Sequence, residues 1–424
     1  MSLIDRILDG RIHKGSVTIA RPDGSNRSFG KPAAGWPDVV IRINDRGAER
    51  RILTNPRLGL GETFMDGAVS VDDDDIMGLV ELVRRNNVWE KGGEIGDPKP
   101  LKRAFKKIMR PFNQMNSLAR SRSNVAHHYD LSNDFYRQWL DEDMQYSCAY
   151  WPDADLSAGG AAISQLSLDQ AQTAKKAHIA AKLALQPGQR VLDIGCGWGG
   201  MALYLNRVAD VDVLGITLSQ EQLKLAQERA KAAGVADRVK FELIDYRDLA
   251  RREAAGFDRI VSVGMFEHVG VPQFDTFFRA AANLMHDDGV MLMHTIGRMG
   301  KPGATDAFTR KYIFPGGYIP SLSETLEASE KVKLIASDIE NLRLHYALTL
   351  REWYKRVRDI REDIIAQYDE DFYRMWIFYL SGATAAFESG GMCNHQYQFV
   401  RDRRALPLSR DYMLKAEKEY LAKG

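Results

Sequence analysis

One stretch of the sequence, VLDIGCGWGG at residues 191–200, combines the residue types that bind a nucleotide. Its apolar start predicts a strand that is buried on both faces. Gly195, Gly197 and Gly199 then remove the Cβ atoms, so the backbone can turn sharply and approach a ligand closely. Asp193 places a carboxylate at the carboxyl end of the strand, where open α/β sheets bind their ligands.

The residues around the glycines indicate which nucleotide binds. Gly195, Gly197 and Gly200 also satisfy the GxGxxG spacing of dinucleotide sites, which is a weak signal by itself. A dinucleotide site has an acidic residue about 20 positions further on, at the end of the next strand. Here that strand, 211–216, is followed by TLS without an acid. Asp193 suits the positive sulfonium of S-adenosylmethionine better, and a purely structural glycine turn is the alternative.

Strands and helices alternate along this part of the chain and place the candidate residues at one edge. The repeat predicts a doubly wound, mainly parallel α/β sheet of Rossmann-like type. Glu267 follows the fourth predicted strand and His294 ends the fifth, on the same side as the glycine turn. The aromatic-rich residues 301–390 predict helices that cover the site. The expected strands are 191–194, 211–216, 239–244, 259–263 and 290–296, and the expected helices are 164–185, 198–208, 219–233 and 273–286.

Length and composition indicate two domains and no disulfide framework. The 424 residues exceed the size at which one hydrophobic core stops growing. The three cysteines are too few for a disulfide framework, and no apolar run is long enough to span a membrane. Residues 1–90 predict a small α+β domain with a role in lipid binding, membrane binding or oligomerisation. Its acidic run at 72–75 is interpreted as a helix start, and no metal site is predicted.

Residues 91–123 are expected to form a linker with a basic amphipathic helix. Between residues 98 and 129 there are eight Lys or Arg and no Asp or Glu. Two interpretations stay open: a helix on an anionic membrane surface, through the basic segment 99–122, or a solvated helix packed on the protein body. Nucleic acid is not expected, because no series of stacking aromatics accompanies the charges.

Nine motifs in order resemble one family. The chain resembles the cyclopropane-fatty-acyl-phospholipid synthases and their mycolic-acid relatives over about residues 124–400. These motifs are HHYDLSNDFY (127–136), YSCAYW (146–151), VLDIGCGWGG (191–200), GITLSQEQ (215–222), DYRDL (245–249), FEHVG (266–270), HTI (294–296), FPGGYIPS (314–321) and HYALTLREW (345–353).

The resemblance implies a reaction for a catalytic domain at residues 124–424. The methylene of S-adenosylmethionine is added to a cis double bond of an unsaturated phospholipid acyl chain, and a carbocation is deprotonated by bound bicarbonate to close a cyclopropane ring. It also implies a homodimer in the cytoplasm, peripheral on the inner face of the membrane. The alternatives are a fatty-acyl C-methyltransferase that leaves a methyl branch, and a non-catalytic lipid-binding module.

The resemblance also assigns residues to two sites. The implied holders of bicarbonate are the side chains of Glu267, His294 and Tyr346 and the backbone of Cys148 and Ile296. The implied donor-binding residues are Tyr129, Tyr146, Ser147, Asp193, Gly195, Gly197, Thr217, Gln222, Asp245 and Tyr246. The sequence departs from some members at Ala383, where they carry a cysteine, and at Tyr246-Arg247, where some mycolic relatives have Trp-Glu.

Overall fold

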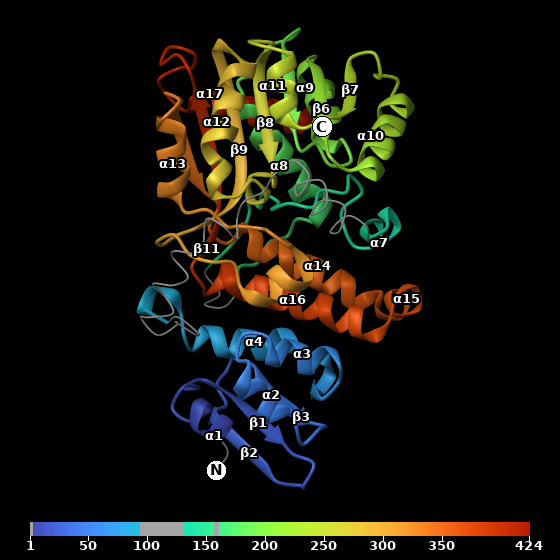
Figure 1. Ribbon diagram of the computed structural model, residues 1–424, viewed down its shortest axis with the longest axis vertical. Coiled ribbons are helices and arrows are strands. Elements are labelled where there is room, and N and C mark those ends of the chain that lie inside the picture. The colour runs from blue at the N-terminus through green and yellow to red at the C-terminus, as the bar shows by residue number, and fades with distance from the viewer. Residues whose placement is uncertain (1–2, 94–130, 157–160) are drawn as a thin grey trace.

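The computed structural model describes residues 3–93, 131–156 and 161–424. A small sheet lies at the N-terminal end of the elongated molecule and a large sheet lies at the other end, with a layer of helices between them (Figure 1). Tyr129 and the basic segment 99–122 fall outside the described residues. Among the helices within the described ranges, none is long and apolar enough to cross a membrane.

The small sheet has the strand order β2-β1-β3-β4. Strand β1 (Gly15–Ala20) pairs antiparallel with β2 (Asn26–Lys31) and parallel with β3 (Asp38–Ile43), and β4 (Val69–Val71) pairs antiparallel with β3. The helices of this part are α1 (Leu3–Leu8), α2 (Ala48–Thr54), α3 (Gly59–Met65) and α4 (Ile76–Arg85).

The acidic run at 72–75 lies at the start of α4, as the sequence predicted: Asp72–Asp74 form a 3-10 turn and Asp75 directly precedes the helix. Asp73 and Asp74 have positive φ angles, and Asp75 accepts a hydrogen bond of 2.9 Å from the backbone N–H of Gly78. Asp75 is thereby the N-cap of α4, a position that favours aspartate.

The large sheet has the strand order β10-β11-β9-β8-β5-β6-β7. Its central strands, from β9 to β7, pair in parallel, whereas β11 runs antiparallel to both of its neighbours. This arrangement confirms the predicted doubly wound α/β fold. The strands are β5 (Arg190–Ile194), β6 (Asp212–Thr217), β7 (Val239–Leu243), β8 (Phe257–Val263), β9 (Met285–Arg298), β10 (Ile335–Asn341) and β11 (Met392–Val400).

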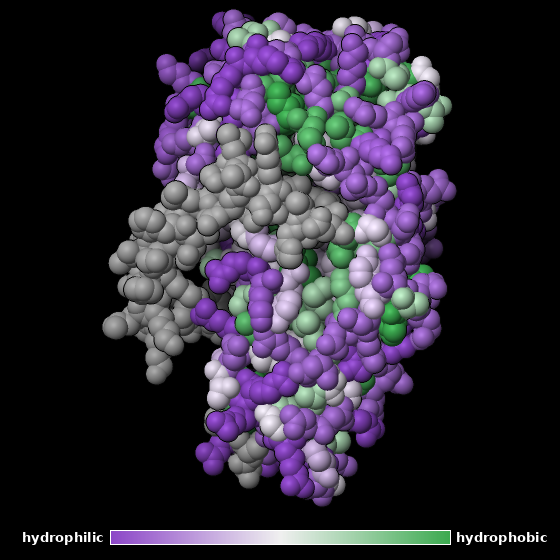
Figure 2. Space-filling model, turned by 45° about the vertical axis from the view of Figure 1, so that its right-hand side comes forward, coloured by the Kyte–Doolittle hydropathy of each residue, from purple (hydrophilic) through white to green (hydrophobic). Residues whose placement is uncertain are grey.

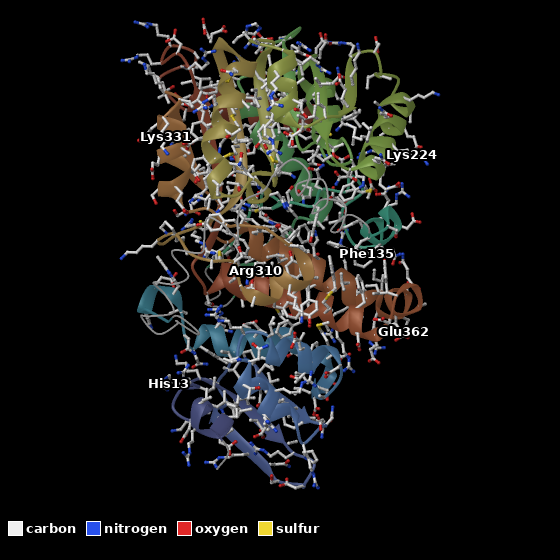
Figure 3. All side chains as sticks on the ribbon, in the orientation of Figure 1. His13, Phe135, Lys224, Arg310, Lys331 and Glu362 are labelled. Carbon is white, nitrogen blue, oxygen red and sulfur yellow. The ribbon has the colours of Figure 1, made fainter. Side chains whose placement is uncertain are left out.

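Helices cover both faces of the large sheet (Figure 1). Charged side chains such as Lys224 of α10 and Lys331 at the end of α13 lie on the outside of these helices (Figure 3). A space-filling view shows a mostly hydrophilic face with smaller hydrophobic areas (Figure 2). The helices around this sheet are α8 (Leu168–Lys182), α9 (Gly200–Ala209), α10 (Gln220–Ala232), α11 (Tyr246–Arg252), α12 (Phe274–Leu284), α13 (Leu322–Glu330) and α17 (Asp411–Lys423).

The prediction of helices alone over residues 301–390 is wrong at β10. Buried and exposed residues alternate only weakly along this edge strand. Its buried residue Asp338 pairs with Arg410. Its neighbour β11 also has buried polar side chains, including His395 and Gln396. Because both strands place polar groups where apolar ones are usual, the hydrophobic pattern of a strand is hidden.

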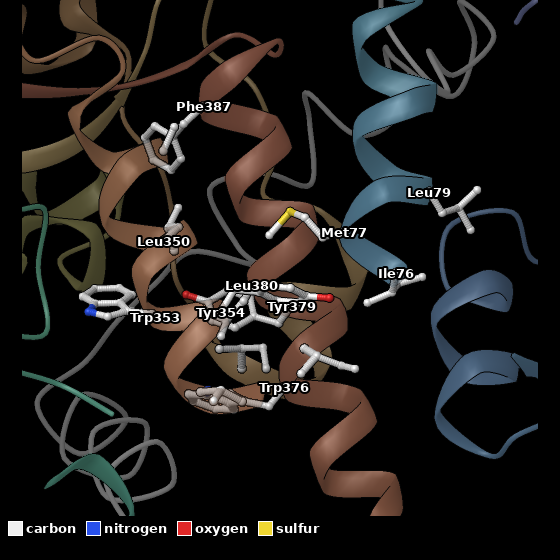
Figure 4. Packing of buried hydrophobic residues seen from close by; sticks show 14 of the residues in the cluster. Ile76, Met77, Leu79, Leu350, Trp353, Tyr354, Trp376, Tyr379, Leu380 and Phe387 are labelled. Carbon is white, nitrogen blue, oxygen red and sulfur yellow. The ribbon is translucent and has the colours of Figure 1, made fainter. Parts of the chain in front are cut away.

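An aromatic core joins the helical layer to the N-terminal part. The layer consists of α14 (His345–Asp359), α15 (Arg361–Gln367) and α16 (Glu370–Glu388). In Figure 4, Trp353 of α14 lies on one side of α16, and Met77 of α4 points toward α16 from the other side. The same hydrophobic cluster therefore includes residues from α4 and from the layer that covers the large sheet.

The contact between α3 and this layer depends on a missing side chain at Gly61. A Cβ at this position would lie 2.6 Å from the ring of Phe308 and 3.0 Å from that of Phe378. Because both rings must move, we expect Gly61→Ala to lower the free energy of unfolding by about 1–2 kcal/mol. Denaturant unfolding measures this change.

The matched control is Gly382→Ala inside α16, where an added Cβ would have nothing within 4 Å. Here the better helix propensity of alanine is expected to raise stability by about 0.5–1 kcal/mol. Equal effects of the two substitutions would contradict the close packing of α3 on the helical layer.

Candidate active site

The glycine turn after β5 has the geometry that the sequence predicts. Gly195, Gly197 and Gly199 have φ angles of +81°, +54° and +84°, which side chains rarely allow. A Cβ at Gly195 would lie 2.8 Å from Met265. The backbone N–H of Gly195 donates to the carbonyl of Ile216 at 2.9 Å, which ties the turn to β6. Helix α9 then begins at Gly200.

The turn forms one wall of a cavity at the carboxyl edge of the large sheet. The other walls come from the ends of β6, β7 and β8 and from the segments 144–147 and 315–316. All the described residues of the predicted donor site line this cavity. These residues are Tyr146, Ser147, Asp193, Gly195, Gly197, Thr217, Gln222, Asp245 and Tyr246.

The buried carboxyl group of Asp193 lies in the cavity lining. Burial raises the pKa of Asp193 to about 7, although the nearby positive charge of Lys175 opposes this shift. The Oδ2 atom of Asp193 is buried and has no hydrogen-bond partner within the described part of the chain. A cationic ligand in the cavity would therefore stabilise the ionised carboxylate.

Lys175 is a residue of this site that the sequence analysis missed. Its ammonium donates to Gln145 Oε1 and to Ser147 Oγ, each at 2.8 Å, and both acceptors belong to residues that line the cavity. Burial lowers the pKa of Lys175 to about 8. The signal in the sequence was a set of three lysines, at 175, 176 and 182, in an alanine-rich helix that packs inside the protein.

Polar side chains at the ends of β6 and β7 are held in place by their neighbours. Thr217 Oγ1 donates to Gln222 Oε1 at 2.9 Å, which leaves the NH2 group of Gln222 as a donor for other partners. Asp245 caps α11 and pairs with Arg247 at 2.7 Å. Tyr246 is buried with its ring at an edge-to-face angle to Phe277. Arg247 also lines the cavity, and the sequence analysis gave it no role.

Two buried polar atoms lie beyond β8 and within β9. Glu267 lies in a short 3-10 turn that follows β8, whereas β9 continues to Arg298, so the prediction that His294 ends its strand is wrong. Glu267 Oε1 accepts a hydrogen bond of 2.6 Å from the backbone N–H of Ile296, two residues after His294 on β9. Glu267 Oε2 and His294 Nε2 are buried, and neither has a hydrogen-bond partner among the residues described. Burial raises the pKa of Glu267 to about 7 and lowers that of His294 well below its usual range.

Tyr346 and Cys148 belong to the helical side of the site. Tyr346, in the first turn of α14, packs against the rings of Trp353 and Phe387. Burial raises the pKa of the Cys148 thiol far above its usual range, so the sulfur stays protonated and donates to the carbonyl of Ala149. The next backbone N–H, of Ala149, donates to Thr349 Oγ1 of α14 at 3.1 Å, which ties this segment to the helix of Tyr346.

Comparison with known proteins agrees with this architecture. The family model described as mycolic acid cyclopropane synthetase matches residues 116–397. The chain is 38% identical over 365 residues to cyclopropane-fatty-acyl-phospholipid synthase of Escherichia coli, which covers 85% of this chain and 87% of the relative. It is 41% identical over 283 residues to a probable fatty acid methyltransferase of Pseudomonas putida, covering 65% and 68% of the two chains.

Solved structures show the same likeness. The cyclopropane synthase MmaA2 from Mycobacterium tuberculosis superimposes with a TM-score of 0.59 at 31% identity, covering 66% of this chain and 97% of its own. The mycolic acid cyclopropane synthase CmaA1, complexed with SAH and CTAB, gives a TM-score of 0.58 at 32% identity, with the same coverage.

The fold, the glycine turn and the cavity define an enzyme of the S-adenosylmethionine-dependent methyltransferase class. Within this class, the chain belongs to the mycolic acid cyclopropane synthetase family.

Donor binding depends on the path of the glycine turn. We expect Gly195→Ala to weaken the affinity for S-adenosylhomocysteine about tenfold or more, because the new Cβ collides with Met265 and displaces the cavity wall. Isothermal titration calorimetry measures this affinity.

Gly188→Ala is the matched control, because Gly188 has a similar φ of +78° and an added Cβ would meet nothing within 4 Å. It lies outside the cavity lining, so the affinity should stay at the wild-type value. A comparable loss in both variants would mean that backbone strain alone, rather than the position of the turn, controls binding.

Proposed function

We propose that this enzyme converts a cis double bond of an unsaturated phospholipid acyl chain into a cyclopropane ring. One observation carries the proposal: two unpartnered polar atoms, Glu267 Oε2 and His294 Nε2, are buried at the same sheet edge as the donor cavity. S-adenosylmethionine supplies an electrophilic methyl group when it is bound. The names of the relatives from Escherichia coli and Mycobacterium tuberculosis support the ring-forming reaction.

An alkene is a weak nucleophile, so the chain's residues must act by positioning and by excluding water. Aromatic side chains cover the site: the ring of Tyr146 stacks on Phe314 at 6.4 Å and approaches Trp353 at 5.2 Å. Such faces exclude water from the carbocation that methyl transfer leaves on the acyl chain, and they stabilise its positive charge.

We further propose that Glu267, His294 and Tyr346, with the backbone at Cys148 and Ile296, hold a bicarbonate ion. When bound, bicarbonate supplies a base for the proton that must leave before the ring can close. The donor set suits this ion, because His294 Nε2 and the Tyr346 hydroxyl can donate to its oxygens and Glu267 Oε2 can accept from its hydroxyl. The lowered pKa of buried His294 makes its ring a weak base, and the raised pKa of Cys148 keeps its thiol protonated, so neither competes as a strong base or nucleophile.

A second candidate is a fatty-acyl C-methyltransferase, favoured by the name of the Pseudomonas putida relative and by that of the tuberculostearic acid methyltransferase of Mycobacterium tuberculosis. Both reactions share the donor site and differ in how the carbocation is quenched. Mass spectrometry of acyl chains, after incubation of the enzyme with donor and unsaturated phospholipid vesicles, separates them. A gain of one CH2 with loss of the alkene and no reducible bond supports cyclopropanation. A branched product that has gained one CH2 and still carries a reducible double bond supports the alternative, because loss of a proton from the carbocation without ring closure leaves an alkene. No product supports a lipid-binding module.

The proposed base site predicts a split between turnover and donor affinity. Glu267→Gln removes the carboxylate acceptor and Tyr346→Phe removes a hydroxyl donor, so we expect turnover to fall about 100-fold and about tenfold respectively. Affinity for S-adenosylhomocysteine should change by less than about twofold, because neither residue lines the donor cavity. Equal losses in turnover and in affinity would contradict the assignment.

Burial of Glu267 predicts a pH dependence. With a pKa raised to about 7, this carboxyl is protonated below that pH, so it loses its negative charge, gains an O–H donor and accepts more weakly from the hydroxyl of bicarbonate. We therefore expect turnover, at saturating bicarbonate, to fall as the pH drops through about 7, and we expect this limb to be absent from the residual activity of Glu267→Gln. If the turnover of the variant still falls as the pH drops through about 7, a group other than Glu267 causes the fall.

We also propose that the basic segment 99–122 binds anionic membranes on the cytoplasmic side and that the enzyme is a homodimer. Eight cations without a compensating acid support the first point. Charge reversal at Lys102, Arg103, Lys106 and Lys107 should abolish co-sedimentation with phosphatidylglycerol vesicles, while donor affinity stays unchanged. Unchanged sedimentation would favour the solvated linker helix, and light scattering tests the dimer.

A further inference from the structure

A row of polar side chains crosses the large sheet behind His294. Glu340 on β10 pairs in register with Gln396 on β11, and Gln396 pairs in register with His294 on β9. Lys182, at the C-terminal end of α8, reaches this row: its ammonium binds Glu340 and donates to Gln396 Oε1 at 2.8 Å. Lys182, Gln396 and His294 are all buried, so their hydrogen bonds are shielded from competition by water.

Lys182 fixes which way the amide of Gln396 points. An ammonium group only donates hydrogen bonds, so it must face the Oε1 atom of the amide and not the NH2 group. The NH2 group of Gln396 then faces His294 Nδ1, at 3.1 Å. A flipped amide would place NH2 against the ammonium and leave two donors in contact.

This amide orientation in turn fixes the proton on His294. An NH2 group donates, so Nδ1 must accept and carries no proton. Burial keeps the ring neutral by lowering its pKa, and a neutral imidazole has one N–H. The proton is therefore on Nε2, the buried ring nitrogen that has no partner within the described ranges.

We propose that Lys182 and Gln396 are positioning residues that hold His294 in the Nε2–H tautomer, so that it donates to the anion bound between His294 and Glu267. This inference rests on the proposed function of that site. With Nε2 as a donor and Glu267 Oε2 as an acceptor, the two atoms complement an anion that carries both an acceptor oxygen and a hydroxyl. With the opposite tautomer, both atoms would accept, and an anion would meet two lone pairs instead of a donor.

The protonation of His294 is measurable without any substrate. In the full-length enzyme with uniformly 15N-labelled histidine, two-bond 1H–15N correlation spectra separate bare from protonated ring nitrogens. Loss of one signal set in a His294→Asn variant assigns it among the nine histidines. We expect a proton on Nε2 and a bare Nδ1. A protonated Nδ1, in a neutral ring or in an imidazolium, overturns the inference, whatever the enzyme's reaction is.

A pair of variants tests the positioning role. Gln396→Met removes the amide that faces His294. Gln398→Met makes the same change two residues further along β11, where the amide instead donates to the backbone of Lys182 and to Tyr412. We expect Gln396→Met to raise the bicarbonate concentration needed for half-maximal turnover about ten- to hundredfold and to allow Nδ1 protonation, with S-adenosylhomocysteine affinity unchanged. Gln398→Met should leave both the bicarbonate requirement and the tautomer as in the wild type.

The outcomes separate this inference from the proposed function. If wild-type turnover is independent of bicarbonate, the proposed base site is wrong, whereas the tautomer measurement still stands. If wild-type turnover needs bicarbonate but Gln396→Met and Gln398→Met raise the requirement equally, or neither changes it, Gln396 has no positioning role. If Gln396→Met does not fold, Lys182→Met, which frees the amide to rotate, should give a mixture of His294 tautomers, and a single Nε2–H form there overturns the proposal.

Discussion

Desolvation of polar groups at the carboxyl edge of the large sheet is the constraint on which the rest of the structure depends. Asp193, Glu267 and His294 are all buried there. Burial favours the neutral form of each group, because it raises the pKa of the two carboxyls and lowers the pKa of the histidine. A buried polar atom without a partner costs free energy, so the folded protein must hold these groups by other contacts. Two lysines of one helix, α8, bind the neighbours of these groups. Lys175 donates to Ser147 in the cavity lining, and Lys182 donates to Gln396, whose amide faces His294.

The same constraint explains why the site spans so many elements. The parallel strands bring the donor cavity and the Glu267–Ile296 contact to one edge, but they cannot close the site against water. The helical layer closes it with aromatic rings, and this layer packs on α3 and α4 of the N-terminal part through the same hydrophobic cluster. The N-terminal part therefore packs directly on the covering layer.

The sequence predicted the central part of the fold well and the flanking part less well. The glycine turn, the parallel strands and the positions of Glu267 and His294 at one edge follow from strong local signals: apolar runs, glycines that need positive φ, and strand ends. Strand β10 escaped prediction because its one buried residue is Asp338, so its apolar residues do not alternate with polar ones as in a typical strand. Long-range pairings are also invisible in one sequence, and the contacts of Lys175 and Lys182 are of this kind. The roles assigned to Tyr346 and Cys148 came from family resemblance and remain proposals.

We propose that a base held at Glu267 and His294 removes a proton from the transferred methyl group. The most direct measurement uses S-adenosylmethionine with a fully deuterated methyl group, unsaturated phospholipid vesicles and mass spectrometry of the acyl chains. We expect the product to retain two deuterium atoms on the added carbon, because one is lost as the ring closes. A product that retains all three, on a methyl branch, would contradict the proposal, since the carbocation would then have been quenched without deprotonation of that methyl group.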